Sequence, residues 1–559
     1  MDITVALTGQ LPAILMAAAV LTAPLSWLLL RAYRRAVIRS MGRSASAAAA
    51  TAGPPMEAVI AGSDTPALAI VRIDGAQDLA GGHRANPWLQ RLRREWRRST
   101  IVYVLGGLAF ALVIAFPRTI EPDRHFYPGR YTWITVCYLW PLVVALWLMT
   151  PERRWRLQIA GVYVATLGVV GTWMLLKNPG VSVFQLPLYW VLTNGWESLI
   201  PLAFLIRPLR AIGPLVLIFI VSGVTGAAVI VTVAGLSEEF LLAYATAGNA
   251  VGLGATPLFV LLHLCGFALG AGLLGLFLVR WLSRRYRAKK TSDQVLILDS
   301  LFLLFGIMHS MDLAFEHWSW ALTGVVAFLA YKLVTIAGFG ALARRRPDGS
   351  PPPTLLLLRV FSLGKRSARL YDSIAGRWRH IGSVNMISGP DLATSTLEPH
   401  ELTEFLSGRL ARQFVSDDED LQKRVAALDT GPDPDGRFRV NEFFCFSDTW
   451  QPTMQRLAHS ASAVLMDLRS FASANRGCLY EIGQLLATVP LERVVFVVDG
   501  TTDQPFLASC LQREWCAVPG NSPNRRSALP QLRSFEMRPP ETRSVVNLLR
   551  AMTAATENA

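Results

Sequence analysis

The residues Ala463-Val-Leu-Met-Asp-Leu-Arg-Ser-Phe-Ala-Ser-Ala-Asn-Arg-Gly-Cys-Leu-Tyr-Glu-Ile-Gly483 decide the fold of the C-terminal part of the chain. The apolar run that ends at Asp467 predicts a buried strand, and the polar loop after it leads into a helix expected over 477–489. Neighbouring segments repeat this pattern of a short apolar strand followed by an amphipathic helix. Such alternation predicts a parallel sheet with helices on both faces.

The other elements are assigned outward from this stretch. Strands are expected at 354–361, 383–387, 438–446, 463–467 and 494–499, with a weaker strand near Leu532. Helices are expected at 368–380, 400–415, 450–460, 477–489 and 505–515, and from Glu541 onward. Right-handed crossovers between these strands give a doubly wound, flavodoxin-like α/β domain, which we expect to occupy residues 354–559.

Ligands of doubly wound domains bind beyond the carboxyl ends of the strands. Several strands here are followed by polar or charged side chains, so these converge on one rim. Some of the aspartates also have an ordinary alternative role as caps of the following helices. The candidate ligand-binding residues are Ser362, Arg366, Asp391, Asp448, Trp450, Arg469, Asn475 and Asp499, with Asp467 beside them.

The quoted stretch resembles nucleoside deoxyribosyltransferase-like and TIR-like domains. In those families a strand ending in Asp-Leu leads, through a loop carrying Asn or Gly, into a helix bearing (Tyr/Phe)-Glu-(Leu/Ile)-Gly. The matching positions are Asp467, Leu468, Asn475, Tyr480, Glu481, Ile482 and Gly483. The family glutamate faces a ribose and is needed to break an N-glycosidic bond. The resemblance therefore implies that Glu481 is catalytic, with Asp467 at the rim, Asn475 shaping the loop, and NAD or another nucleotide as substrate.

A carboxylate suits this chemistry, because positive charge builds on the sugar ring as the base departs. Near the start of its helix, Glu481 also has the ordinary role of complementing the helix dipole. Two other functions stay open. One is a non-catalytic, membrane-tethered signalling module that self-associates into a homo-oligomer through the α/β domain. The other is a transporter or sensor with a regulatory soluble domain.

The chain before Thr354 has the composition of a membrane protein. Charged residues make up 17% of the whole chain, against about a quarter in soluble proteins. From Thr354 onward there are 23 basic and 23 acidic residues, so the net charge of +14 lies entirely before it. Windows of about 20 apolar residues predict nine spans. They lie at 11–30, 100–117, 131–149, 157–176, 186–206, 211–235, 256–280, 293–309 and 318–341.

The basic residues orient these spans. Of the 31 basic residues before Thr354, 26 lie on alternate loops, which the positive-inside rule places in the cytoplasm. We therefore expect a multi-pass protein of the cell (inner) membrane with its N-terminus outside and its α/β domain cytoplasmic. The lipid bilayer is the expected partner, and nucleic acid is not, because the excess charge lies on short loops between spans. The expected parts are an anchor (1–30), a basic cytoplasmic loop (31–99), a helical membrane domain (100–343) and a linker (344–353), before the α/β domain.

Polar residues inside apolar spans are candidates for a transport or sensing path, because burying them in lipid is costly. They are Asn194, Glu197, His263 and Asp299, and their ordinary alternative is to pair inside the bundle. The outer-loop residues His309, Asp312, Glu316 and His317 include types that bind metals. We interpret them as a polar loop and predict no metal site and no cofactor. The six cysteines show no CxxC pair, as in a reducing compartment.

The segment Pro87-Trp-Leu-Gln-Arg-Leu-Arg-Arg-Glu-Trp-Arg-Arg98 precedes the second span. It predicts a basic amphipathic helix, for which two interpretations are open. The helix lies on anionic headgroups, or it simply leads into the span that follows.

Overall fold

The computed structural model describes residues 27–41, 68–73, 87–119, 127–150, 152–178, 180–195, 198, 213–235, 237–250, 252, 256–316, 318–344, 351–360, 365–388, 401, 404–405, 408–446, 448–526, 530–539 and 541–557. The chain divides into two compact units. The membrane unit comprises residues 1–32, 98–346 and 397–403. The α/β unit comprises residues 33–97, 347–396 and 404–559.

The described part of the membrane unit consists of helices. Those of the first half are α3 (Pro87–Ala115), α4 (Pro128–Cys137), α5 (Trp140–Met149), α6 (Arg153–Lys177), α7 (Gln185–Trp190) and the π-helix η2 (Val191–Gly195). Those of the second half are α10 (Gly213–Gly235), α11 (Glu238–Ala250), α12 (Thr256–Leu269), the π-helix η3 (Gly270–Gly275), α13 (Leu276–Arg287), α14 (Asp293–Glu316) and α15 (Thr323–Arg344).

Six helical stretches among the described residues are long and apolar enough to cross a membrane. They are Pro87–Ala115, Pro128–Met149, Arg153–Lys177, Val260–Arg287, Asp293–Ser310 and Ser319–Arg344, and each overlaps one predicted span. The predicted span at 211–235 corresponds to α10, in which Ile218–Ala227 is a shorter apolar helix. The predicted span at 11–30 falls largely outside the described residues, and of the span at 186–206 the structure describes 186–195 and 198. Six apolar helices of this length are compatible with the predicted membrane protein, and they account for six of the nine predicted spans.

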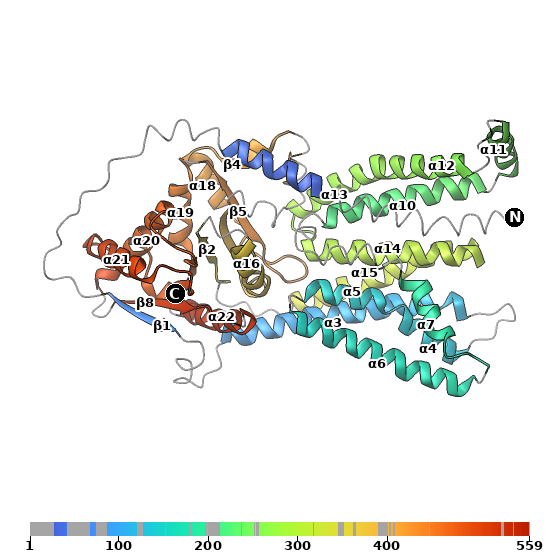
Figure 1. The fold of residues 1–559 in the computed structure, drawn as a ribbon, viewed down its shortest axis with the longest axis horizontal. Coiled ribbons are helices and arrows are strands. Elements are labelled where there is room, and N and C mark those ends of the chain that lie inside the picture. The colour runs from blue at the N-terminus through green and yellow to red at the C-terminus, as the bar shows by residue number, and fades with distance from the viewer. Residues whose placement is uncertain are drawn as a thin grey trace. The chain divides into compact units, whose positions relative to one another are not determined.

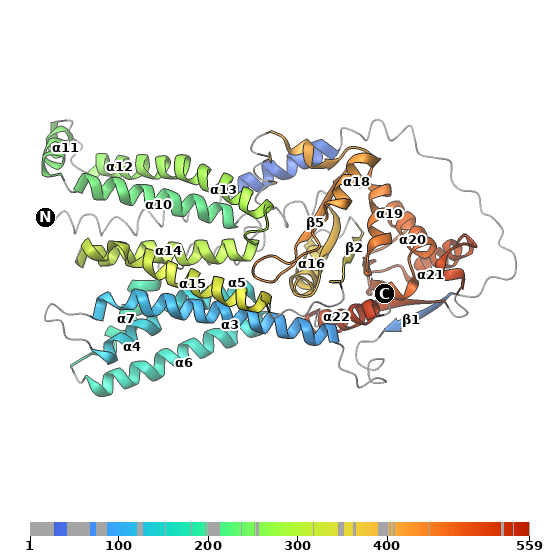
Figure 2. The same ribbon diagram turned by 180° about the vertical axis from the view of Figure 1, so that it is seen from behind.

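Glycines allow the helices of the membrane unit to approach closely. In Figure 2, α10 runs beside α12, and Gly226 of α10 lies against Gly266 and Gly270, where an added Cβ would meet backbone atoms. On α15, a Cβ added to Gly324 would overlap the carbonyl oxygen of Gly306 on α14. Small residues at such crossings let backbones pack directly in a bilayer.

This contact gives a first prediction. Gly324→Ala is expected to destabilise the membrane unit by about 1–3 kcal/mol, because the new methyl group forces α14 and α15 apart. The matched control is Gly340→Ala in the same helix, where an added Cβ meets nothing within 4 Å. Thermal unfolding of the full chain in detergent should show a lower midpoint for Gly324→Ala alone. Equal midpoints for the two variants would mean that the contact is not tight.

The α/β unit is built on a parallel sheet of eight strands. The strands are β1 (Ala69–Ile73), β2 (Leu355–Arg359), β3 (Val384–Ser388), β4 (Phe414–Val415), β5 (Val440–Cys445), β6 (Ala463–Asp467), β7 (Val494–Val498) and β8 (Gln531–Glu536). Their spatial order is β1-β8-β7-β6-β2-β3-β5-β4, and all the described pairings are parallel. Every residue of β2, β3, β6 and β7 is buried, as expected for strands covered on both faces.

Helices cover the two faces of this sheet. Its helices are α16 (Lys365–Trp378), α18 (Asp418–Ala426), α19 (Trp450–Ser460), α20 (Arg476–Thr488), α21 (Gln504–Cys516) and α22 (Glu541–Glu557). Figure 1 shows α19, α20 and α21 side by side, and their apolar residues share one core with alternate strand residues such as Leu356 and Met466. The intervening residues, such as Leu357 and Leu465, form a second core with α16 and α22. The predicted layering of an α/β domain is therefore present.

Two parts of the predicted basic loop belong to the α/β unit. Residues Ala69–Ile73 form β1, which pairs in parallel with β8 at the edge of the sheet. No strand is predicted there from the sequence. In α3, Leu92 is buried in the second core of the α/β unit, and Trp88 packs against it. These apolar side chains of the basic amphipathic segment are thus covered by protein, and the same helix continues into the apolar stretch up to Ala115.

The last residues of the segment predicted as a helix over 400–415 do not form an α-helix. Leu410–Gln413 forms a single 3-10 turn, and Phe414–Val415 pairs with β5 as the edge strand β4. The Phe414 ring lies 5.6 Å from that of Phe444 and 4.9 Å from that of Phe446. The aromatic contacts across the two strands thus favour an extended conformation over a local helical preference.

Candidate functional site

The candidate site lies at the carboxyl ends of β2 and β6, in the middle of the sheet. The register of these two strands places Arg359, the last residue of β2, beside Asp467, the last residue of β6. Both residues are buried. The helices that follow these strands, α16 and α20, belong to opposite faces of the sheet. Polar groups from both layers therefore meet at this edge.

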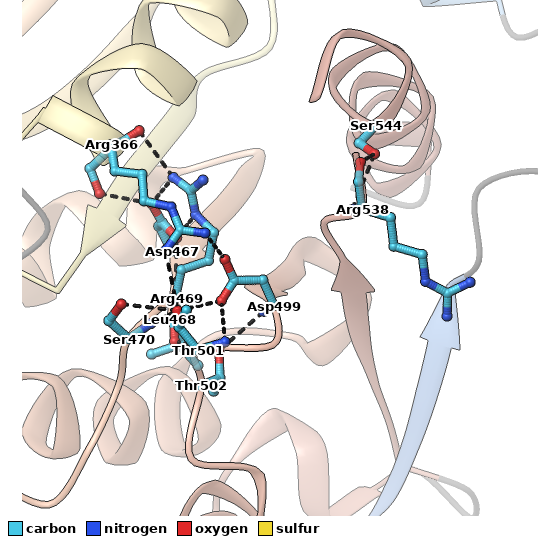
Figure 3. A network of polar contacts seen from close by, with 11 residues as sticks. Arg366, Asp467, Leu468, Arg469, Ser470, Asp499, Thr501, Thr502, Arg538 and Ser544 are labelled. Atoms are coloured by element: carbon cyan, nitrogen blue, oxygen red, sulfur yellow. Dashed lines mark hydrogen bonds and ion pairs between the residues drawn. The ribbon is translucent and has the colours of Figure 1, made fainter. Parts of the chain in front are cut away.

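Asp467 lies in a fully buried ion pair (Figure 3). The guanidinium of Arg469 donates from Nε to Oδ1 and from Nη2 to Oδ2 of Asp467, both at 2.8 Å. The hydroxyl of Ser367, at the start of α16, also donates to Oδ2 at 2.8 Å. Asp467 is 0% exposed and Arg469 2% exposed. Both carboxylate oxygens of Asp467 are thus occupied by groups of the protein itself.

A second set of polar contacts links the loops after β6 and β7 to α16. Arg366 forms an ion pair with Asp499, and its carbonyl oxygen accepts a hydrogen bond from Nη2 of Arg469 at 3.2 Å. The other oxygen of Asp499 accepts from the amide and hydroxyl of Thr501. Ser470 adopts a left-handed conformation with φ of 56° and donates from its amide to the Thr501 hydroxyl. The Arg366 side chain keeps 37% of its surface exposed.

Glu481 also belongs to this edge, and one of its carboxyl oxygens is unsatisfied. It lies on α20 and is 2% exposed, and its Oε2 is buried without a hydrogen-bond partner in the described part of the chain. Burial raises the pKa of Glu481 to about 8, although the nearby positive charge of Arg359 opposes this rise. At neutral pH the carboxyl group is therefore largely protonated. Buried polar groups are rarely left unsatisfied, which makes Glu481 the leading candidate of this edge.

Several predicted residues surround the start of α20. Asn475 precedes this helix, and its Oδ1 accepts from the amide of Ala472 at 2.9 Å, which closes the loop after β6. The ring of Trp450 lies edge-on to that of Tyr480 at 5.4 Å, beside Gly477. Asp448 is exposed on the turn before α19. The structure thus gathers Asp467, Arg469, Arg366 and Asp499 into one network, and Asp448 is not among the described residues that take part in it.

Some residues of this edge are not predicted from the sequence. Arg359 is one of them, although a single arginine at the end of the apolar run Leu355–Leu358 is a usable signal. Ser367 and Tyr371 are also missed; the Tyr371 hydroxyl donates to the carbonyl oxygen of Leu358 at 2.6 Å. Burial and the negative charges of Asp467 and Glu481 raise the pKa of Tyr371. The candidates Ser362 and Asp391 lie outside the described residues.

Two polar candidates of the membrane unit have partners inside it. Asp299 of α14 forms an ion pair of 2.7 Å with Lys332 of α15. Asn194 donates to the carbonyl oxygen of Cys137, where α4 ends. Glu197 and His317 lie outside the described residues. Within the described ranges, no group of three or more His, Cys, Asp or Glu residues is placed to hold a metal ion.

No protein-family model matches this chain, and neither a curated protein nor a solved structure matches it.

Proposed function

We propose that this is a membrane-anchored protein whose α/β unit, on the cytoplasmic side, binds a nucleotide and breaks its N-glycosidic bond. The observation that carries the proposal is the buried Glu481 carboxyl, whose Oε2 has no hydrogen-bond partner among the described residues. It lies on the helix that follows β6, which is the position the nucleoside deoxyribosyltransferase-like and TIR-like resemblance assigns to the essential glutamate.

The strand order supports a ligand site at this edge. Along the chain, β2, β3, β6, β7 and β8 have the spatial order β3-β2-β6-β7-β8. This is the 2-1-3-4-5 order of flavodoxin-like domains, with β4 and β5 added at one edge and β1 at the other. In such sheets the ligand crevice opens where the chain reverses its direction of winding, outside the carboxyl ends of the strands. Here that position falls between β2 and β6, beside Glu481.

The proposed cleavage of the N-glycosidic bond depends on the negative charge of the ionised Glu481 carboxylate. Breaking the bond between C1′ of the ribose and the base leaves the bonding electrons on the base, and positive charge develops on the sugar ring. An ionised Glu481 stabilises or captures that charge, and water then completes the hydrolysis at C1′. A substrate that already carries a positive ring, as NAD does, favours the ionised form of Glu481 on binding.

The experiment uses the full chain in lipid nanodiscs, incubated with NAD and with other nucleotides, and measures free base by chromatography. Glu481→Gln is expected to lower base release at least 100-fold while retaining nucleotide binding. The matched control is Glu419→Gln, because Glu419 is an exposed residue of α18 whose carboxylate pairs with Lys423 of the same helix. Base release that persists in Glu481→Gln would remove Glu481 from the mechanism.

The burial of the site favours a second candidate, a binding or signalling module without catalysis. Asp467 and Arg469 are paired with each other, and Glu481 is almost inaccessible. A wild-type chain that releases no base from any nucleotide, yet self-associates through its α/β unit, would support this alternative. Sedimentation of the nanodisc-free chain at several concentrations measures that association.

A further inference from the structure

The turn between α13 and α14 carries a dense set of positive charges. Arg280, Arg284, Arg285, Arg287, Lys289 and Lys290 lie within eleven residues, and all are exposed. No acidic residue occurs in the sequence between Glu239 and Asp293. Arg280, Arg284, Arg287 and Lys290 form no ion pair in the described part of the chain, and the Arg285 guanidinium lies over the Trp281 ring, 4.7 Å from its centroid.

The faces of α13 separate these charges from the protein interior. Val279, Ser283 and Tyr286, spaced at helical intervals, are buried. Arg280, Trp281, Arg284 and Arg285 are exposed on the other side. This spacing places three arginines and a tryptophan on the face of the helix that is not covered by the bundle.

Length places these residues at the depth of the phospholipid headgroups. The helical stretch Val260–Arg287 has 28 residues and is about 42 Å long at 1.5 Å per residue. The hydrocarbon core of a bilayer is about 30 Å thick, which needs about 20 residues. Residues 260–279, which include no charged residue, fill that length. The remaining turns, from Arg280 to Arg287, therefore extend into the headgroup layer, where tryptophan is also preferred.

The turn itself is held in one conformation. The amides of Lys289 and Lys290 donate to the carbonyl oxygens of Tyr286 and Arg285, at 3.0 and 2.9 Å. The Tyr286 hydroxyl donates to Oδ1 of Asp293 at 2.9 Å, which engages the nearest carboxylate. The backbone that carries the cations is thus ordered, so the conformational entropy lost when an anion binds is mainly that of the side chains.

From these observations we infer that the α13–α14 turn is a binding site for the phosphate group of an anionic phospholipid. The exposed arginines supply planar donors that match phosphate oxygens, and Trp281 contacts the upper part of the acyl chains. This inference does not depend on the proposed function of the α/β unit.

The test is native mass spectrometry of the full chain, released from membranes that contain phosphatidylcholine and phosphatidylglycerol in equal amounts. The wild type is expected to retain phosphatidylglycerol in preference to phosphatidylcholine. Replacing Arg284, Arg285 and Arg287 together by Gln should lower that retention at least tenfold. Replacing the same three residues by Lys, which keeps the charge, should preserve most of it.

Two control experiments test whether lipid retention depends specifically on the α13–α14 turn and on the acyl chains. Arg153→Gln with Arg154→Gln removes exposed charge at the start of α6 and should change retention less than twofold. Inorganic phosphate at millimolar concentration should not displace the lipid, because the acyl chains contribute to binding. The inference is overturned if the wild type shows no preference, if the Gln and Lys variants behave alike, if the α6 variant loses retention equally, or if free phosphate displaces the lipid.

Discussion

Arg469→Met is expected to lower the free energy of unfolding of the α/β unit by about 3–5 kcal/mol. The substitution leaves Asp467, which is 0% exposed, with the Ser367 hydroxyl and the amide of residue 469 as its hydrogen-bond donors. A buried carboxylate without its counter-ion retains its desolvation cost and loses the attraction that offset it. Hydrogen exchange of the amides of β6 and β7 in the full chain measures the effect directly.

Two comparisons separate this effect from a general loss of charge. Arg513→Met removes one partner of an exposed pair with Glu514 and should cost less than about 1 kcal/mol. The double variant Asp467→Leu with Arg469→Met removes both buried charges, and it should be more stable than Arg469→Met alone. If Arg469→Met costs no more than Arg513→Met, Asp467 is not buried as an ionised partner.

Glu481→Gln, in contrast, is expected to raise the free energy of unfolding of the α/β unit, by an amount that depends on pH. Burial raises the pKa of Glu481 from 4.5 to about 8, so the folded chain binds this proton more tightly than the unfolded chain. The stability contributed by the protonated carboxyl is fully present below about pH 4.5 and is lost as pH rises through about 8. Gln does not titrate, and its advantage over Glu should reach the order of 4 kcal/mol above pH 8.

Hydrogen exchange of α20 and β6 at pH 5, 7 and 9, corrected for the intrinsic dependence of exchange on pH, measures this advantage. The wild type and Glu481→Gln should differ little at pH 5 and most at pH 9. Glu419→Gln, on the exposed surface, should show no such trend. A Gln variant that is less stable than the wild type at pH 9 would mean that an ionised Glu481 is held by Arg359 as part of the fold.

Taken with the activity test, this prediction distinguishes a functional glutamate from a structural one. A residue kept for stability should be costly to replace. A residue kept for chemistry can be replaced with a gain in stability and a loss of activity. Our proposal places Glu481 in the second case.

The sequence predicts those elements whose apolar pattern is local. The bounds expected for α19 and β6 agree with the structure to the residue, because a polar or capping residue flanks each apolar pattern. The strand β1 is missed because Ala69–Ile73 is short and mostly exposed, and the strand it pairs with, β8, lies more than 450 residues later. Pairing of that kind depends on tertiary structure and leaves no local signal.

The candidate site is predicted in part for the same reason. The position of Asp467 at a strand end follows from the apolar run before it, but its partners do not. Ser367 lies 100 residues earlier, and the bidentate contact with Arg469 depends on the turn after β6. The sequence places Glu481 on a helix, but whether its carboxyl faces solvent or the interior depends on how α20 packs. The partners of Asp467 and the orientation of the Glu481 carboxyl therefore depend on the tertiary structure.

The position of β1 in the sheet has a consequence for biosynthesis. Ala69–Ile73 leaves the ribosome before the six apolar helical stretches of the described residues, whereas its partner Gln531–Glu536 emerges more than 450 residues later. At translation rates of about 5–20 residues per second, β1 is without β8 for roughly 20–90 seconds. The sheet therefore receives this edge strand only after all six apolar stretches have been synthesised. A recombinant product that starts at Thr354 lacks that edge and exposes the unpaired amides of β8 to other chains.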